Sequence, residues 1–126
     1  MNIFEKYINK ITSLIIKNQK FLELNDFLIL PTSPVEANLA EERFVEEIDG
    51  VTMNDYLDWL VLGYVISLTG CPAISIPCGF SSQGLPIGIQ IISLPHNERN
   101  LLRLASWLES LIGCTIKTPI TPVAIK

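Results

Sequence analysis

This 126-residue sequence has one long stretch without charged residues. No Asp, Glu, Lys or Arg occurs from residue 59 to residue 97. A membrane-spanning helix would explain such a stretch, but glycines and prolines leave no uninterrupted apolar segment of about 20 residues. Hydrocarbon tolerates irregular backbone only where protein covers it. The stretch is therefore predicted to be the buried core of a sheet, and no membrane contact is expected.

Basic residues, cysteines and histidines are also scarce. Nine Lys and Arg stand against 13 Asp and Glu and form no basic block, so nucleic acid is not an expected partner. The cysteines Cys71, Cys78 and Cys114 have no zinc spacing, and only His96 could join them, so no metal site is predicted. The odd cysteine number and the charged residues near the N-terminus favour a reducing, cytoplasmic location over export.

Apolar residues at helical spacing predict two helices in the first part of the chain. The first covers residues 3–22, with lysines mostly between the apolar positions. The second is placed at 53–69 and is expected to be mostly buried. Thr52 and Asp55 have the spacing of a capping box before it, and Gly70 supplies its stop.

The second part of the chain adds strands and a last helix. A short apolar run at 26–31 predicts a buried strand that ends at its proline, and two uncharged runs at 73–80 and 86–93 predict strands joined by a turn. Strands with such continuous apolar character are typically covered on both faces. Asn97 is expected to cap a helix that Gly113 closes.

These elements follow one another as αβαββα, an α/β pattern. Segment 32–50 is acidic and without sustained periodicity, so a solvated loop or short helix is favoured there over a metal or substrate site. Three helices can shield only a small part of the two apolar faces of these strands from water. We therefore expect marginal solubility or self-association for the chain alone.

No residue is assigned a catalytic role. Ser81 and Ser82 lie in the predicted turn between two core strands, and a pair of Cys78 with His96 would need an orienting group and an oxyanion site that no local motif supplies. Cys78 is interpreted as a small buried residue and His96 as a loop residue without a role. Gln90, inside an apolar strand, is expected to join a structural hydrogen-bond network rather than to contact substrate.

The run SLTGCPAISIPCGF, a turn and then GLPIGIQIIS resemble the C-terminal core of the amidase-signature hydrolases. DFLILPTSPVE resembles the family's strand and proline loop, IDGVTMNDYLDWL the start of a helix, and 97–113 the closing helix. TPITP resembles the family's natural end. The resemblance implies that 1–126 is a single partial domain, the C-terminal segment of an amidase domain.

The resemblance implies a large mixed sheet flanked by helices and hydrolysis of amide bonds without a metal or organic cofactor. The family's nucleophilic serine, its second serine in a cis peptide and its buried lysine lie in the part that precedes this segment. We therefore expect action on a small or aryl amide only when an N-terminal piece is supplied on another chain. The alternative is a non-catalytic binding or interaction remnant of a broken or duplicated amidase gene.

Four residues are candidates for lining a substrate pocket. Trp59, Leu60, Gly63 and Tyr64 share one helical face at spacings of three and four, and the resemblance implies that this helix borders the pocket, with core packing as the alternative. Glutaminase subunits of the transamidosome branch carry an aspartate where this chain has Leu60. A glutamine-specific role is therefore disfavoured, unless the neighbouring Asp58 takes that position.

Overall fold

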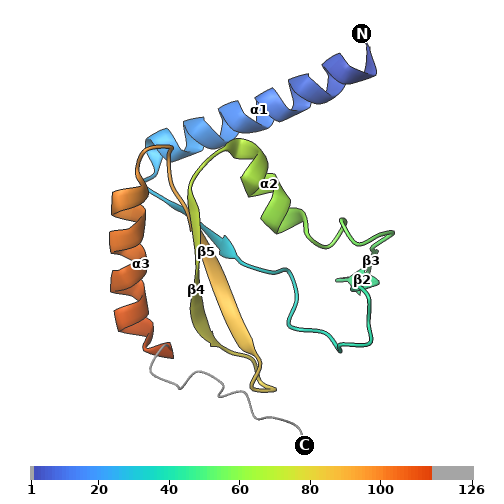
Figure 1. Ribbon diagram of the computed structural model, residues 1–126, viewed down its shortest axis with the longest axis vertical. Coiled ribbons are helices and arrows are strands. Elements are labelled where there is room, and N and C mark those ends of the chain that lie inside the picture. The colour runs from blue at the N-terminus through green and yellow to red at the C-terminus, as the bar shows by residue number, and fades with distance from the viewer. Residues whose placement is uncertain (1, 115–126) are drawn as a thin grey trace, which may run out of the picture.

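The computed structural model describes residues 2–114 and has the predicted α/β organisation with one addition (Figure 1). The loop between β1 and α2 contains a short antiparallel hairpin, so the order αβαββα is confirmed apart from that hairpin. The predicted TPITP tail lies outside the described residues. The elements are α1 (Ile3–Leu24), β1 (Leu28–Pro31), β2 (Glu47–Ile48), β3 (Val51–Thr52), α2 (Val61–Thr69), β4 (Ala73–Phe80), β5 (Pro86–Ile92) and α3 (Glu98–Ile112).

The main sheet has the strand order β1-β5-β4 and is antiparallel throughout. Successive side chains of a strand point to opposite faces of the sheet, and side chains of the central strand β5 are packed on both faces. Ile91 packs on the face that α3 covers, together with Ile76 and Leu101. Ile92 packs on the other face with Leu22 of α1 and Ile66 of α2. The core therefore consists of two clusters joined through β5.

Helix α1 confirms the predicted first helix and begins at a capping box. The Asn2 side chain accepts a hydrogen bond from the N–H of Phe4 at 3.3 Å, and the Asn2 N–H donates to Glu5 Oε2 at 2.9 Å. Only Leu22 of this helix is buried. No helix within residues 2–114 is long and apolar enough to cross a bilayer.

Helix α2 begins later than its sequence predicts. Thr52 pairs with Glu47 in the hairpin, and the Asp55 carboxylate accepts from the N–H groups of Leu57 at 2.7 Å and Asp58 at 3.2 Å. Such local side-chain bonds to the backbone compete with helix formation. The predicted helix is therefore wrong over 53–60, and the predicted capping box does not form.

The expectation that α2 is mostly buried is also wrong. Val61, Tyr64 and Leu68 are between 40% and 44% exposed, whereas Ile66 and Thr69 are buried. The stop at Gly70 is confirmed, because this residue has φ 68°, a left-handed conformation that glycine adopts without steric cost.

Cover of the sheet is uneven. Strand β1, predicted to be buried, is an edge strand in which Ile29 is 49% exposed while its neighbours are partly buried. Cover on both faces is complete only at the end of β5, where residues 90–93 are all buried. Strand β4 alternates between buried and exposed positions. Three helices suffice for one end of the sheet and leave the rest open.

We expect Ile91→Ala to lower the free energy of unfolding by about 2–5 kcal/mol, because Ile91 has no exposed area and its truncation leaves a cavity. Ile29 stands directly opposite it in the β1–β5 ladder and is half exposed, so Ile29→Ala is the matched control. Urea denaturation of both variants measures the difference. Equal losses would show that β5 is not the centre of the core.

Candidate functional site

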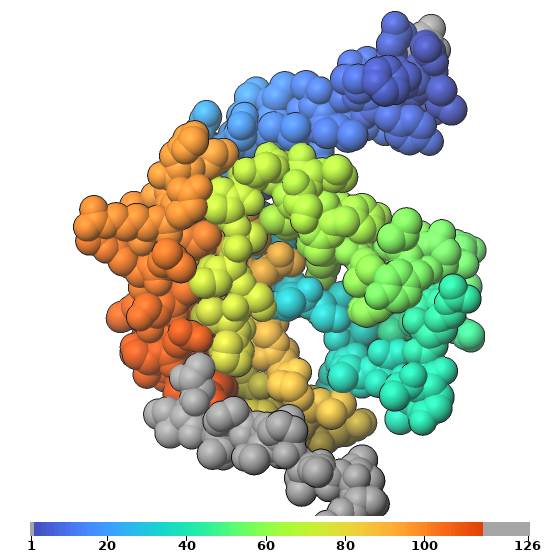
Figure 2. Space-filling model, viewed as in Figure 1, coloured from blue at the N-terminus to red at the C-terminus, as the bar shows by residue number. Residues whose placement is uncertain are grey.

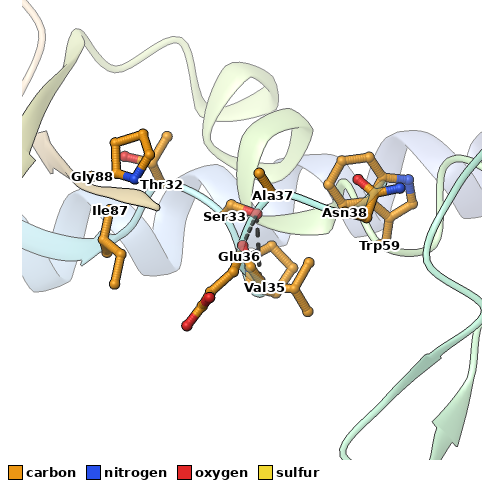
Figure 3. A pocket seen from close by; sticks show the side chains of 11 residues that line it. Thr32, Ser33, Val35, Glu36, Ala37, Asn38, Trp59, Ile87 and Gly88 are labelled. Atoms are coloured by element: carbon orange, nitrogen blue, oxygen red, sulfur yellow. Dashed lines mark hydrogen bonds between the residues drawn. The ribbon is translucent and has the colours of Figure 1, made fainter. Parts of the chain in front are cut away.

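A cavity of about 530 Å³ lies at the open end of the sheet, between the loop after β1, the segment before α2 and the beginning of β5. In Figure 3, Trp59 and Asn38 lie at one end of it and Thr32, Ile87 and Gly88 at the other. Its lining is mostly apolar, and among residues 2–114 the only ionisable side chain that lines it is that of Glu36. The lining residues are those at 32–38, Trp59 and those at 86–88.

Hydrogen bonds inside the loop after β1 shape one wall of the cavity. Ser33 Oγ donates to the carbonyl of Val35 at 2.8 Å, and the Asn38 side-chain amide donates to the carbonyl of Glu42 at 3.2 Å. The loop is tied to the sheet where the N–H of Thr32 donates to the carbonyl of Gly88 at 3.1 Å. These bonds hold Pro34 and Val35 against the space that the cavity occupies.

Gly88 allows the close approach of two hydroxyl groups at the floor of the cavity. A Cβ atom at this position would lie 3.0 Å from Thr32 Oγ1, and Thr32 Oγ1 is itself 2.9 Å from Ser75 Oγ. A larger residue would require Thr32 Oγ1 to shift by a few tenths of an ångström. The position therefore favours glycine because of packing, and not because of an unusual backbone conformation.

Trp59 lines the cavity with an aromatic ring system. Its ring meets that of Tyr56 edge to face, with centroids 5.8 Å apart and an interplanar angle of 89°. The indole nitrogen is buried and has no hydrogen-bond partner within residues 2–114. A buried donor without an acceptor costs about 1–3 kcal/mol. The described residues alone therefore do not satisfy this part of the fold.

The structure separates the four predicted pocket residues. Trp59 lines the cavity, whereas Leu60, Gly63 and Tyr64 are not among its lining residues. Trp59 and Leu60 precede α2, so the four do not share one helical face, and Gly63 and Tyr64 are exposed. Sequence reasoning missed the loop 32–38 as a wall, although its prolines and its place after a strand were visible.

Gln90 has the structural role that its position predicts. It is 8% exposed, and its side-chain amide donates to the carbonyls of Pro31 at 3.0 Å and Leu62 at 3.2 Å. The prediction of a structural network is confirmed. One side chain thus ties the end of β1 and the first turn of α2 to the central strand.

The candidate nucleophiles do not form a catalytic arrangement. Ser81 Oγ accepts from the N–H groups of Gln83 and Leu85 at 3.2 and 3.3 Å and so stabilises its turn. Cys78 is partly buried beside the beginning of β5, whereas His96 is exposed beyond its end. Ile92 lies five residues after Ile87 along the strand, which is a distance of roughly 17 Å. The two side chains therefore cannot act as a pair.

The carboxylate of Asp58 is engaged within its own turn. The backbone N–H of Asn54 donates to it at 2.8 Å and the Asn54 side chain at 3.1 Å. These bonds hold the pKa of the Asp58 carboxyl below its ordinary value. Asp58 is exposed and is not among the residues lining the cavity.

The sequence of this chain matches a known protein family. The family model named Amidase matches residues 2–102. The chain belongs to the amidase family. It is 39% identical over 106 residues to a glutamyl-tRNA(Gln) amidotransferase subunit from Thermodesulfovibrio yellowstonii, and this match covers 81% of the chain but 21% of the relative. This amidase-family chain thus spans about a fifth of the length of the curated relatives it matches.

Solved structures give the same relation in three dimensions. The 6-aminohexanoate cyclic dimer hydrolase superposes with a TM-score of 0.75 and 28% identity, over 93% of the amidase-family chain and 26% of the hydrolase. The corresponding glutamyl-tRNA(Gln) amidotransferase subunit from Thermotoga maritima superposes with a TM-score of 0.67 and 26% identity, over 86% of the chain and 22% of that protein. The fold is therefore that of a part of these larger proteins.

We expect Gln90→Leu to lower the free energy of unfolding by about 1–3 kcal/mol, because the carbonyls of Pro31 and Leu62 lose their shared donor. Gln83 lies exposed in the β4–β5 turn, so Gln83→Leu is the control and should change stability by less than about 0.5 kcal/mol. Urea denaturation provides the measurement. A neutral Gln90→Leu would show that both carbonyls find other donors.

The lowered pKa of Asp58 predicts a pH-dependent contribution to the local fold. Because the pKa is lowered on folding, the ionised carboxylate stabilises its turn at neutral pH, and this contribution disappears as pH falls through the folded-state pKa. The Asn54 amide proton resonance should therefore titrate with Asp58, at lower pH than an unperturbed aspartate does. The substitution Asp58→Asn should abolish that transition in an NMR titration. If the transition persists in this variant, it belongs to another group.

Proposed function

We propose that these residues are the C-terminal part of an amidase, which hydrolyses a small or aryl amide when the N-terminal part is supplied on another chain. The main support for the proposal is that most of this chain matches the family, whereas the chain covers only a small part of its relatives. The family match spans 101 of 126 residues, from 2 to 102, yet the chain covers 21% of one relative and 26% of one homologous structure.

The chemistry of the cavity supports a binding role for this part. Its lining contains hydroxyl and amide groups but no nucleophile beside a base, the arrangement that acyl transfer needs. Glu36 is exposed, and Figure 3 shows its carboxylate pointing away from Trp59. We infer that the cavity holds the organic group of an amide and that the bond-breaking residues come from the N-terminal part.

The lining favours an apolar substrate over glutamine. Pro34, Val35, Trp59 and Ile87 offer surfaces for an alkyl or aryl group, while Thr32 and Asn38 can orient an amide. Recognition of an α-amino group calls for a free carboxylate. Leu60 has none, and that of Asp58 is bonded to Asn54 outside the cavity. The carboxylate of Glu36, which does line the cavity, points away from Trp59 (Figure 3). The amidotransferase role of the sequence relatives is therefore not carried over to this chain.

Turnover of an aryl amide such as 4-nitroacetanilide tests the proposal. The purified chain should show no turnover and no labelling by a fluorophosphonate, since it supplies no activated serine. A mixture with the part of the T. yellowstonii relative that precedes the matched region should hydrolyse the amide and become labelled on that partner. Trp59→Ala should then raise KM more than it lowers kcat, because it removes binding surface.

The control is the double variant Ser81→Ala, Ser82→Ala, which should leave turnover of the mixture unchanged. Labelling of Ser81 or Ser82 in the isolated chain would overturn the assignment of the nucleophile to the partner. A mixture that assembles yet hydrolyses neither the aryl amide nor glutamine would favour the non-catalytic alternative. Hydrolysis of glutamine alone would overturn the substrate class.

A further inference from the structure

Helix α1 carries one apolar row along its length, and only part of that row is covered. Phe4, Ile11, Ile15 and Leu22 are separated by seven, four and seven residues, so their side chains lie in line on the helix. Leu22 is 3% exposed and Ile15 is partly buried, but Ile11 is 37% and Phe4 67% exposed. The same face is therefore core at one end and open at the other.

The covered end is the C-terminal half of the helix. Leu22 packs with Ile66 and Cys71, and the Asn18 side chain donates to Cys71 Sγ at 3.2 Å. Figure 2 shows the N-terminal half of α1, in dark blue, extending beyond the rest of the molecule. We name its open apolar residues the free stripe; they are Ile3, Phe4, Tyr7, Ile8 and Ile11, each at least 37% exposed.

The exposed apolar side chains of this helix require a physical explanation. Isolated helices are marginal in water, and most of their stability in proteins comes from packing of the apolar face. Contiguous exposed apolar side chains on a protein surface mark an interaction site. The free stripe continues a face that is already packed at its other end. A partner that covers it would extend an existing interface.

Basic side chains border the free stripe on one side. Lys6, Lys10 and Lys17 are spaced by four and seven residues, so they form a second row. This row lies about 100–140° around the helix from Ile11, next to the edge of the stripe that Ile3 and Tyr7 form and on the opposite side from Ile16. All three are exposed, and within residues 2–114 they form no ion pair. A partner with carboxylates along one rim would complement this row. An antiparallel second copy would instead place two lysine rows on the same side of the interface, where they repel.

We propose that the free stripe and its lysine row dock the N-terminal part of the amidase, through an apolar groove with an acidic rim. This inference rests on the proposed function. The superposition on the cyclic dimer hydrolase covers 93% of this chain and only 26% of the hydrolase, so the same fold there adjoins much additional chain. That additional chain is the occupant assigned to the stripe, in preference to a second copy.

The test measures the affinity of the full chain for the part of the T. yellowstonii relative that precedes the matched region, by isothermal titration calorimetry. Ile11→Gln should weaken binding at least about tenfold. Ile16→Gln is the matched control and should stay within about twofold of the wild type. Ile16 is on the same helix and 45% exposed, but lies about 140° around it from Ile11. Glutamine is at least as good a helix former as isoleucine, so neither variant should unfold α1.

Three further outcomes decide the proposal. Affinity should fall with added salt, and the triple variant Lys6→Gln, Lys10→Gln, Lys17→Gln should flatten that dependence. Equal affinities of Ile11→Gln and Ile16→Gln, or no binding by the wild type, would overturn the docking surface. A homodimer of the chain alone that Ile11→Gln disrupts would assign the stripe to a second copy instead.

Turnover of the same mixtures separates this proposal from the proposed function. Binding that depends on Ile11 without turnover of any amide would sink the proposed function and leave the docking surface standing. Turnover that survives Ile11→Gln at unchanged affinity would overturn the docking surface and leave the proposed function standing.

Discussion

The packing of β5 on both of its faces is the constraint on which the rest of the structure depends. Ile91 and Ile92 are adjacent, both have no exposed area, and each belongs to a different core cluster. Because successive residues of a strand face opposite sides, one strand joins the α3 layer to the α1–α2 layer. The buried Gln90 extends this role by binding the backbone of β1 and α2.

Cover of the sheet fades from one end of β5 to the other, and this gradient organises the molecule. Its last residues are buried, whereas its first two, Pro86 and Ile87, are exposed and line the cavity together with Trp59. The uncovered half of α1 and the unpaired indole nitrogen of Trp59 have the same cause. A small set of helices can bury only a limited area of apolar sheet, so a fold of this size leaves apolar surfaces open.

The chain spans only part of its amidase relatives, and the open surfaces are consistent with that partial length. In a protein about four to five times as long, with this fold as one part, the open faces need not be compatible with water. Under the proposed function, the cavity is one wall of a binding site, and the catalytic residues come from the other part. The free stripe and the cavity are, on this view, two sections of one boundary with the N-terminal part.

Most of the local structure can be predicted from the amino-acid sequence. Periodicity located the first and last helices, the glycine stops at Gly70 and Gly113 were correct, and the two uncharged runs formed paired strands. These features depend on interactions between residues close in the chain, which spacing and composition record. The resemblance of the strand motifs to amidases also required no coordinates.

Tertiary structure alone decided where cover is present and which residues meet. The sequence pattern predicts too early a start for α2, because the carboxylates of Asp55 and Asp58 accept hydrogen bonds from nearby N–H groups. Residue spacing does not show whether such local bonds or a helix will form. The cavity joins Trp59 to residues 27 positions earlier and later, and such long-range neighbours depend on how the layers pack. Sequence indicated that the sheet needed cover, and only the packing showed which half of α1 and which end of β5 lack it.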